Sequence, residues 1–444
     1  MGLRRKRGRH RRRKDRTLPL GSAVIVASAV AGVYLTAAPE GASAVASTVY
    51  VSPQGDDGAS GSLESPYRTL EKAFSVAKAG TVIEVRGGTY YPARTLSSSV
   101  DGTARDRVEL RPYRAEQVRV DGSRLSTGSS LLSLRADFWT VSGMEFRNAP
   151  GGGLVCTSCA RTVFDNLSTH GNGDTGLTLR GKGSDNNVIR NLDSYDNHDD
   201  ATGGKQADGI AVTHGSGSGN VITGVRAFNN SDDGVDLWRW ASPVTIEHTW
   251  AFGNGENRWR IRDFRGDGSG FQLGGDAPAP SPAHVVRNSA AWDNTQFGFS
   301  ANGNTGAIRL RRTTAYGNQA AGYSFAGSRA RLERNLSVSN GDTNADAGPA
   351  AVSQGNNWSP GRGSGWSAGG RPPRPSSPPT PSRPSAPGGR TARCPSPASW
   401  SWPTARRSAR RWSDARRGAH RTARPVDLGA RLDLVTRRKP ERSA

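Results

Sequence analysis

The sequence has few cysteines, few hydrophobic residues and little net charge outside its two ends. Three cysteines among 444 residues exclude a small disulfide-scaffold protein. A hydrophobic fraction of only 34%, beside 56 glycines, excludes a helical bundle and a polytopic membrane protein. The length is enough for two average domains or for one long array of repeats.

The net charge of +22 lies at the ends of the chain. Residues 1–17 carry +9 and residues 359–444 carry +15, whereas the residues between them carry −2. Because this middle part has no excess of positive charge, it has no general affinity for polyanions. We therefore predict that the protein does not bind nucleic acid.

Residues 1–46 have the order of a secretory signal peptide. A basic run at 4–16 precedes an apolar run at 23–38, and small residues follow it. The apolar run is short for a bilayer-spanning helix, which needs about 20 residues. We predict cleavage after Ala44 or Ala46, and hence a secreted, extracellular protein with no membrane contact after cleavage. An uncleaved membrane anchor is the alternative.

The composition changes abruptly after Trp358. Residues 359–444 hold 14 of the 26 prolines and contain no asparagine, isoleucine, phenylalanine or tyrosine. Such a segment cannot bury a core, so we predict a disordered Arg/Pro/Ser-rich tail. A frameshifted GC-rich reading frame explains this composition, and a genuine basic tail that binds acidic polymer is the alternative.

The middle of the chain, residues 47–358, is a repeat. An asparagine, in most cases two positions after an aromatic residue, recurs with spacings of 25, 33, 24, 40, 24 and 22 residues. These asparagines are Asn172, Asn197, Asn230, Asn254, Asn294, Asn318 and Asn340. Short β-type runs such as GLTLR, GVDLW and NVITG flank the units. Two or three short strands in each repeat predict an all-β fold, a parallel β-helix whose coils stack about 4.8 Å apart.

Stacked coils place equivalent residues above one another, which predicts three columns. The aromatic rings stack, and the asparagine amides form an internal ladder in which each donates to the next. Glycines four residues after an asparagine, such as Gly176 and Gly234, are expected to supply a positive φ at a corner where a Cβ would clash. The two long spacings predict insertions at 198–207 and about 255–268, and such insertions commonly border a binding cleft.

The same architecture extends toward the N-terminus. Further strands are predicted at 50–53, 81–88, 107–112, 117–122 and 138–146. Segment 65–80 has helical spacing, with Leu70, Phe74 and Ala77 on one face and Gly80 at its end. We predict a short helix here that caps the open end of the solenoid, where an apolar core would otherwise be exposed.

Two cysteines lie close together in the segment CTSC. Cys156 and Cys159 follow GGGLV in the repeat region, outside any thioredoxin-like context. A second pair with zinc-site spacing is missing from the sequence. We expect either a small local disulfide or two inert thiols.

Aspartates gather in two segments one coil apart, QADGIAV and NNSDDGVDL. Asp208 and Asp232 are separated by one repeat, so Asp208 is expected to stack beside the corner that holds Asp233, with Asp236 just beyond. Four converging carboxylates repel one another unless a cation lies among them. Hard oxygen ligands at this density suit Ca²⁺, although turn-forming aspartates are the alternative.

Four segments resemble the pectate lyases of polysaccharide lyase family nine: residues 50–91, ADGIAV (207–212), NNSDDGVDLW (229–238) and GDGSGFQLGG (266–275). The resemblance covers about residues 48–358 and implies a right-handed parallel β-helix that binds calcium. By motif position it implies the ligands Asp208, Asp232, Asp233 and Asp236. The chemistry of the family is β-elimination on a polyuronate, which implies an acidic polysaccharide such as pectate as the partner of a secreted monomer.

The sequence departs from this family at the position of the catalytic base. The family has a lysine in the GF-K-LGG segment, whereas this chain has Gln272, whose amide has no basic lone pair to accept the C5 proton. Lys205 is a candidate substitute for the missing base. Four arginines of the second insertion are further candidates or, alternatively, ligands of uronate carboxylates: Arg258, Arg260, Arg262 and Arg265.

Two other functions fit parts of this pattern. A non-catalytic β-helix that binds acidic polysaccharide agrees with the glutamine at position 272. A polygalacturonase-type hydrolase needs paired acids, a Gly-His-Gly segment and an Arg-Ile-Lys segment. The chain has Asp232-Asp233 and Arg260-Ile261-Arg262, but no His-Gly between them. We therefore favour a calcium-dependent lyase, weakened at its base position, over both alternatives.

Overall fold

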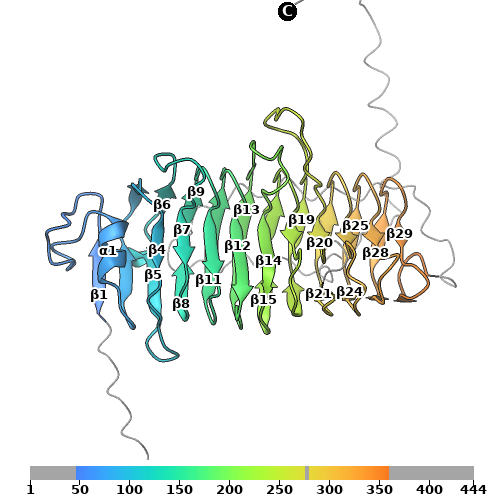
Figure 1. Cartoon of the computed structure of the whole chain (residues 1–444), viewed down its shortest axis with the longest axis horizontal. Helices are drawn as coiled ribbons and strands as arrows, with labels where there is room; N and C mark the ends of the chain where they lie inside the picture. Colours follow the sequence, from blue (N-terminus) through green and yellow to red (C-terminus); the bar gives the residue numbers. More distant parts are fainter. Residues whose placement is uncertain (1–46, 276–279, 360–444) are drawn as a thin grey trace, which may run out of the picture. The chain divides into compact units, whose positions relative to one another are not determined.

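The computed structural model describes residues 47–275 and 280–359, which form a right-handed parallel β-helix of stacked coils (Figure 1). The all-β prediction is therefore confirmed. The predicted signal peptide at 1–46, and all but the first residue of the predicted tail, lie outside the described residues.

Three ladders of parallel strands form the walls of the solenoid. The first contains β1 (Thr48–Val51), β2 (Val82–Val85), β5 (Val108–Pro112), β8 (Trp139–Ser142), β11 (Val163–His170), β13 (Val188–Tyr195), β15 (Asn220–Thr223), β18 (Val244–Glu247), β21 (Val285–Arg287), β24 (Arg309–Arg311), β27 (Arg331–Glu333) and β30 (Val352–Gln354). The second shares β11 and β13 and adds β3 (Gly88–Tyr90), β6 (Val118–Asp121), β9 (Glu145–Arg147), β16 (Arg226–Phe228), β19 (Trp250–Phe252), β22 (Ala290–Trp292), β25 (Thr314–Tyr316) and β28 (Leu336–Val338).

The third ladder is a separate sheet of ten strands, which we call the third sheet. It contains β4 (Leu96–Ser98), β7 (Leu132–Leu134), β10 (Leu154–Thr157), β12 (Leu177–Lys182), β14 (Ile210–Ser216), β17 (Val235–Asp236), β20 (Phe271–Gln272), β23 (Phe299–Ser300), β26 (Tyr323–Ser324) and β29 (Ala345–Asp346). The strands predicted at 50–53, 81–88, 107–112, 117–122 and 138–146 overlap β1, β2, β5, β6, and the pair β8 and β9, respectively.

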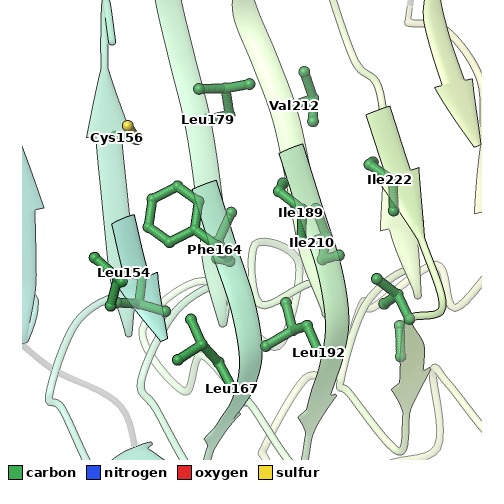
Figure 2. Packing of buried hydrophobic residues seen from close by; sticks show 14 of the residues in the cluster. Leu154, Cys156, Phe164, Leu167, Leu179, Ile189, Leu192, Ile210, Val212 and Ile222 are labelled. Carbon is green, nitrogen blue, oxygen red and sulfur yellow. The ribbon is translucent and has the colours of Figure 1, made fainter. Parts of the chain in front are cut away.

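Inward-facing and outward-facing residues alternate along the strands, and the inward-facing ones fill the interior with apolar side chains. On β12, Leu177 and Leu179 are buried, whereas Thr178 and Arg180 point outward. Figure 2 shows equivalent side chains of neighbouring coils, such as Leu179 and Val212, lying beside one another in the core. One strand therefore supplies a buried face and an outer face, as a period of two requires.

The asparagine ladder is confirmed in every step. Each Nδ2 donates to Oδ1 of the asparagine one coil later, over distances of 2.8–3.1 Å, from Asn172 to Asn340. The same Oδ1 also accepts from the backbone N–H of the earlier asparagine. Because all of these amides except that of the last, half-buried Asn340 are buried, the ladder satisfies polar groups that water does not reach.

The aromatic column is also present on the outer side of the second ladder. Parallel rings stack at centroid distances of 4.3–4.9 Å through His170, Tyr195, Phe228, Phe252 and Trp292. The residue before each ring, such as Ala227 or Ala251, points inward and is fully buried.

The glycine column exists for a different reason from the one predicted. Gly176 and Gly234 do not have a positive φ. Instead, a Cβ at Gly234 would lie 2.6 Å from the Cβ of Ala251, so only glycine leaves room for the facing wall. The left-handed corner residue is the one just before the ladder asparagine, such as Asn229 with φ 57°.

The predicted capping helix is present but shorter than segment 65–80. Helix α1 (Leu70–Val76) begins at Thr69, whose hydroxyl accepts the backbone N–H of Lys72. Its Phe74 ring lies 5.5 Å from that of Trp139 on β8, so the helix covers the core at the N-terminal end. Gly80 does not end this helix, because the chain is already extended at Ala77. A short 3₁₀ turn (Tyr113–Ala115) is the other helical element described, and neither is long enough to cross a membrane.

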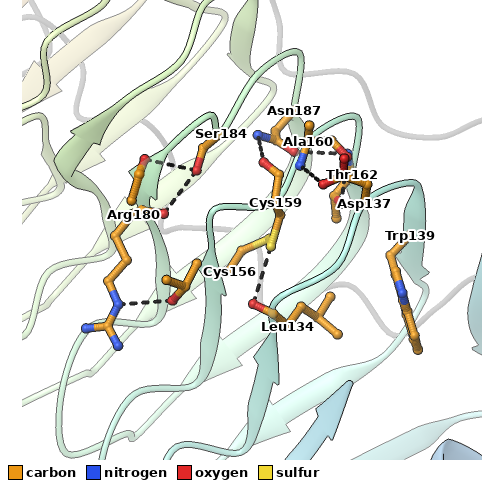
Figure 3. The surroundings of a disulfide bond; sticks show 12 residues. Leu134, Asp137, Trp139, Cys156, Cys159, Ala160, Thr162, Arg180, Ser184 and Asn187 are labelled. Carbon is orange, nitrogen blue, oxygen red and sulfur yellow. Dashed lines mark hydrogen bonds between the residues drawn. A yellow bond between two sulfur atoms is a disulfide. The ribbon is translucent and has the colours of Figure 1, made fainter. Parts of the chain in front are cut away.

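Cys156 and Cys159 form the local disulfide that was one of the two expectations (Figure 3). Both residues are fully buried, Cys156 on β10 and Cys159 in the turn that follows. The carbonyl of Cys159 accepts a hydrogen bond of 2.9 Å from Asn187 one coil later. The disulfide is therefore part of the packed core, with a structural role.

We expect Asn254→Ala to destabilise the fold by about 1–3 kcal/mol, because the substitution removes the acceptor of the buried Asn230 backbone N–H and the side-chain donor to Asn294. Chemical denaturation measures this change. Asn344→Ala, at an exposed asparagine, is the matched control and should lower stability by less than about 0.5 kcal/mol. Equal losses in the two variants would contradict a stabilising role for the ladder.

Candidate metal centre

Four aspartates lie at the edge of the third sheet, where the two long insertions rejoin the solenoid. Asp208 ends the first insertion just before β14, and Asp232 and Asp233 form the corner before β17. Asp236 is on β17 itself. All four side chains are buried, and Asp233 is only 2% exposed. Carboxylates without a positive partner are rarely buried in this way, so the arrangement is a candidate cation site.

Three of these carboxylates lie at metal-binding distances. Asp208, Asp232 and Asp233 each offer one oxygen, and these oxygens lie within 4.8 Å of one another. Two ligands on opposite sides of a Ca²⁺ ion are up to about 5 Å apart, so the donor set fits calcium in both chemistry and spacing. Asp236 lies outside this close set, although it is near enough to repel Asp208.

Hydrogen bonds from neighbouring coils fix the orientation of the three carboxylates. The backbone N–H of Asp233 donates to Asp208, and that of Ser269 donates to Asp233 at 2.6 Å. The N–H of Asp267, in the second insertion, donates to Asp232 at 2.7 Å. The site is thus built from three successive coils, and each coil holds the carboxylate of the coil before it.

Burial and repulsion make the four acids weak when no cation is bound. Burial raises the pKa of Asp208 well above its ordinary value, and repulsion from Asp236, Asp232 and Asp233 raises it further. Burial also raises the pKa values of Asp232 and Asp233. Burial raises the pKa of Asp236 to about 7, against the opposing effect of hydrogen bonds from Gln272 and Trp238. A divalent cation would relieve this cost.

Gln272 lies directly beside the acidic cluster. It is on β20, in register with Asp236 on β17. Its Nε2 donates to Oδ1 of Asp236 at 3.0 Å, and the side chain is half-buried. The amide therefore holds a carboxylate of the cluster.

The structure does not bring the other predicted residues into this cluster. Lys205 is exposed in the first insertion, and Arg258 forms a 2.6 Å ion pair with Glu256. Arg260, Arg262 and Arg265 are exposed in the second insertion. Lys205 and the four arginines lie on the two insertions next to the cluster. Their roles as base or as substrate ligands remain predictions.

The two insertions pack against each other. The rings of His198 and Trp259 stack with centroids 4.6 Å apart. The backbone N–H of Arg265 donates to the carbonyl of Gly203 at 2.7 Å. The two insertions therefore form one packed structure, and Asp267 of the second contacts Asp232.

Several residues that support the site were not predicted. Thr175 donates to Asp208, and Asp267 and Ser269 supply backbone donors. The segment GDGSGFQLGG contains the last two, and its position one coil after the SDDG corner was the available signal. Trp238, whose backbone N–H donates to Asp236, follows the cluster in NNSDDGVDLW and was not predicted either.

Comparisons with known proteins agree with this geometry. A family model described as Pel9A-like, right handed beta helix region, matches residues 49–343. Pectate lyase PEL9 of Emericella nidulans is 36% identical over 345 residues, covering 71% of this chain and 84% of that protein. Pectate lyase L of Dickeya chrysanthemi is 32% identical over 315 residues, covering 67% of this chain and 73% of that protein.

Two solved structures are also similar. The crystal structure of pectate lyase Pel9A superposes with a TM-score of 0.65 at 28% identity, covering 72% of this chain and 82% of that chain. A rhamnogalacturonan lyase superposes with a TM-score of 0.62 at 25% identity, covering 70% of this chain and 87% of that chain.

We expect the metal-free protein to lose stability as the pH rises from about 4 to about 8. The folded pKa values of the four acids lie above the ordinary 3.8, so the folded state binds these protons more tightly than the unfolded state. This stabilisation is complete below the unfolded pKa and is lost as the pH passes the folded values, with Asp236 at about 7.

Thermal unfolding with a chelator, across this pH range, measures the effect. Asp232→Asn should flatten the profile because it removes one buried charge, whereas Asp342→Asn, at an exposed acid, should not. Saturating calcium should restore stability at the high-pH end. A wild-type profile that rises with pH under chelation would contradict the electrostatic description of the cluster.

Proposed function

Because the chain belongs to the Pel9A-like right-handed β-helix family, we propose that it is a secreted, calcium-dependent lyase that acts on a pectate-like polyuronate. The observation that carries the proposal is the buried set of Asp208, Asp232 and Asp233, with Asp236 and Gln272 alongside. The relatives named pectate lyase support pectate as the substrate. We further propose export by the N-terminal segment and action as a monomer.

Asp208, Asp232 and Asp233 would hold the ion. Asp236, on β17, would lie beside it. When bound, Ca²⁺ draws electron density from the substrate carboxylate and so makes the C5 proton of that uronate more acidic. The protein residues hold their own carboxylates in place through backbone donors of the adjacent coil. Little reorganisation is therefore needed when substrate binds.

β-Elimination then requires a base for the C5 proton, while the C4–O bond breaks and leaves an unsaturated sugar end. Gln272 occupies the position of the family base, and its amide does not accept a proton. Its Nε2 is already used as a donor to Asp236. The wild-type protein should accordingly be a weak lyase. Lys205 is the alternative base, to be tested by Lys205→Ala.

A non-catalytic polysaccharide-binding role is the second candidate, and Gln272 is the observation that favours it. A neutral amide beside Asp236 keeps a hydrogen-bond donor to that carboxylate while removing the group that reacts. One assay separates the possibilities on polygalacturonate. A lyase generates the ultraviolet absorbance of the conjugated product, a hydrolase releases only reducing ends, and a binding protein does neither.

We expect Gln272→Lys to raise calcium-dependent lyase activity by about 10²–10⁴-fold, the usual contribution of a general base. A lysine here would lie beside Asp236, which holds the amine protonated unless calcium competes for that carboxylate. Rates of product absorbance on polygalacturonate, with calcium and with EDTA, measure the change.

Gln272→Arg is the matched control, because it adds a positive charge without a basic lone pair and should not raise the rate. Strong calcium-dependent activity in the wild type, abolished by Lys205→Ala, would identify Lys205 as the base instead. Unchanged rates in Gln272→Lys, with calcium and substrate still bound, would show that the site has diverged beyond this residue.

A further inference from the structure

A tryptophan and an arginine follow directly after the acidic cluster. Trp238 and Arg239 stand in the turn at the end of β17, two and three residues after Asp236. The backbone N–H of Trp238 donates to Oδ1 of Asp236 at 3.0 Å. Three residues of chain span at most about 11 Å, so the Arg239 backbone lies within that distance of Asp236.

The Trp238 ring is fixed by its neighbours. The guanidinium of Arg239 lies 4.5 Å from the ring centroid, and the ring of His214 on β14 meets it edge-on at 4.7 Å. A Cβ at Gly275 would lie only 2.0 Å from Cδ1 of Trp238, so the indole packs against the backbone of the segment after β20. Residues of three coils therefore position this one ring.

Arg239 is exposed, and no acidic side chain of the described residues forms an ion pair with it. Arg180, whose strand β12 pairs with the strand that carries His214, donates to a neutral group, the hydroxyl of Thr157. Several other outward-facing arginines are paired, such as Arg287 with Glu247 at 2.8 Å. Arg239 thus presents an uncompensated cation next to a strongly acidic centre.

Strand register brings Arg180 and the Trp238–Arg239 turn to either side of Thr213, because Thr213 is paired with Arg180 and its hydroxyl donates to the carbonyl of Trp238. Burial lowers the pKa of His214, and repulsion from Arg239 and then Arg180 lowers it further. Arg180, His214 and Arg239 come from or follow β12, β14 and β17, three successive strands of the third sheet. The three residues therefore lie across successive coils of the third sheet.

We propose that Arg239, held on the Trp238 ring, binds the carboxylate of a uronate unit next to the unit at the acidic cluster. This inference rests on the proposed function, because a polyuronate has a carboxylate on every unit. The unit at the calcium site would meet the ion, whereas a neighbouring unit needs a cation from the protein. Arginine suits that role, since its planar guanidinium forms two parallel hydrogen bonds with one carboxylate.

Trp238 acts in this proposal as a positioning residue. Its ring supports the guanidinium by a cation–π contact and so limits the rotamers of a long, exposed side chain. The backbone bond from Trp238 to Asp236 fixes the spacing between the arginine and the acidic cluster. The arrangement selects for acidic polymer over neutral polymer, because the second contact needs a free carboxylate on the adjacent unit.

The test is calorimetry with a hexagalacturonate and calcium, using the full chain. Arg239→Ala should weaken binding by about tenfold or more, as for other hydrogen bonds between charged groups. Against the methyl-esterified hexamer, wild type and Arg239→Ala should bind equally. Trp238→Phe should keep most of the affinity, whereas Trp238→Ala should lose about as much as Arg239→Ala.

Arg312→Ala is the matched control, because Arg312 is also exposed and also has a positive φ, 54° against 53° at Arg239. It should bind both hexamers as the wild type does. A wild type that does not bind hexagalacturonate would overturn the proposed function together with this inference. Unchanged binding in Arg239→Ala, or an equal loss for acid and ester, would overturn the inference alone.

Discussion

The stacking of asparagine amides inside the solenoid is the constraint on which the site depends. Asn230 bonds to Asn197 on one side and to Asn254 on the other, and this fixes the height of its coil. Asp232 and Asp233 follow within three residues of it, so the ladder also fixes where their carboxylates lie relative to Asp208. Glycine at position 234 allows the two walls to approach closely enough for these bonds.

The cluster of acids is costly in the free protein, and the rest of the fold compensates. Four buried carboxyls with raised pKa values oppose folding near neutral pH. A rigid solenoid is suited to bear this cost, because each coil is held by its neighbours on both sides. The same rigidity keeps the site ready for a cation, as functional sites built on regular elements commonly are. Membership of the pectate lyase family is consistent with that reading.

Periodicity explains which features could be predicted from the sequence. The ladder, the aromatic column and the convergence of Asp208 with Asp232 and Asp233 repeat at coil spacing, so the spacing alone placed them. A second pair of buried amides, joined by a 3.0 Å hydrogen bond from Asn187 to Asn220, could not be predicted in the same way because no aromatic residue accompanies it in the sequence. The bond from Gln272 to Asp236 and the Arg239–Trp238 contact depend on side-chain orientation, which spacing does not specify. The family resemblance was confirmed by the comparisons.

The central claim is that the buried acids are a calcium site, and calorimetric titration of calcium into the chelator-treated protein tests it most directly. One ion should bind to the wild type, and Asp233→Asn should weaken that binding at least about tenfold while the thermal transition stays cooperative. Absence of calcium binding in the wild type, or undiminished affinity in Asp233→Asn, would contradict the account.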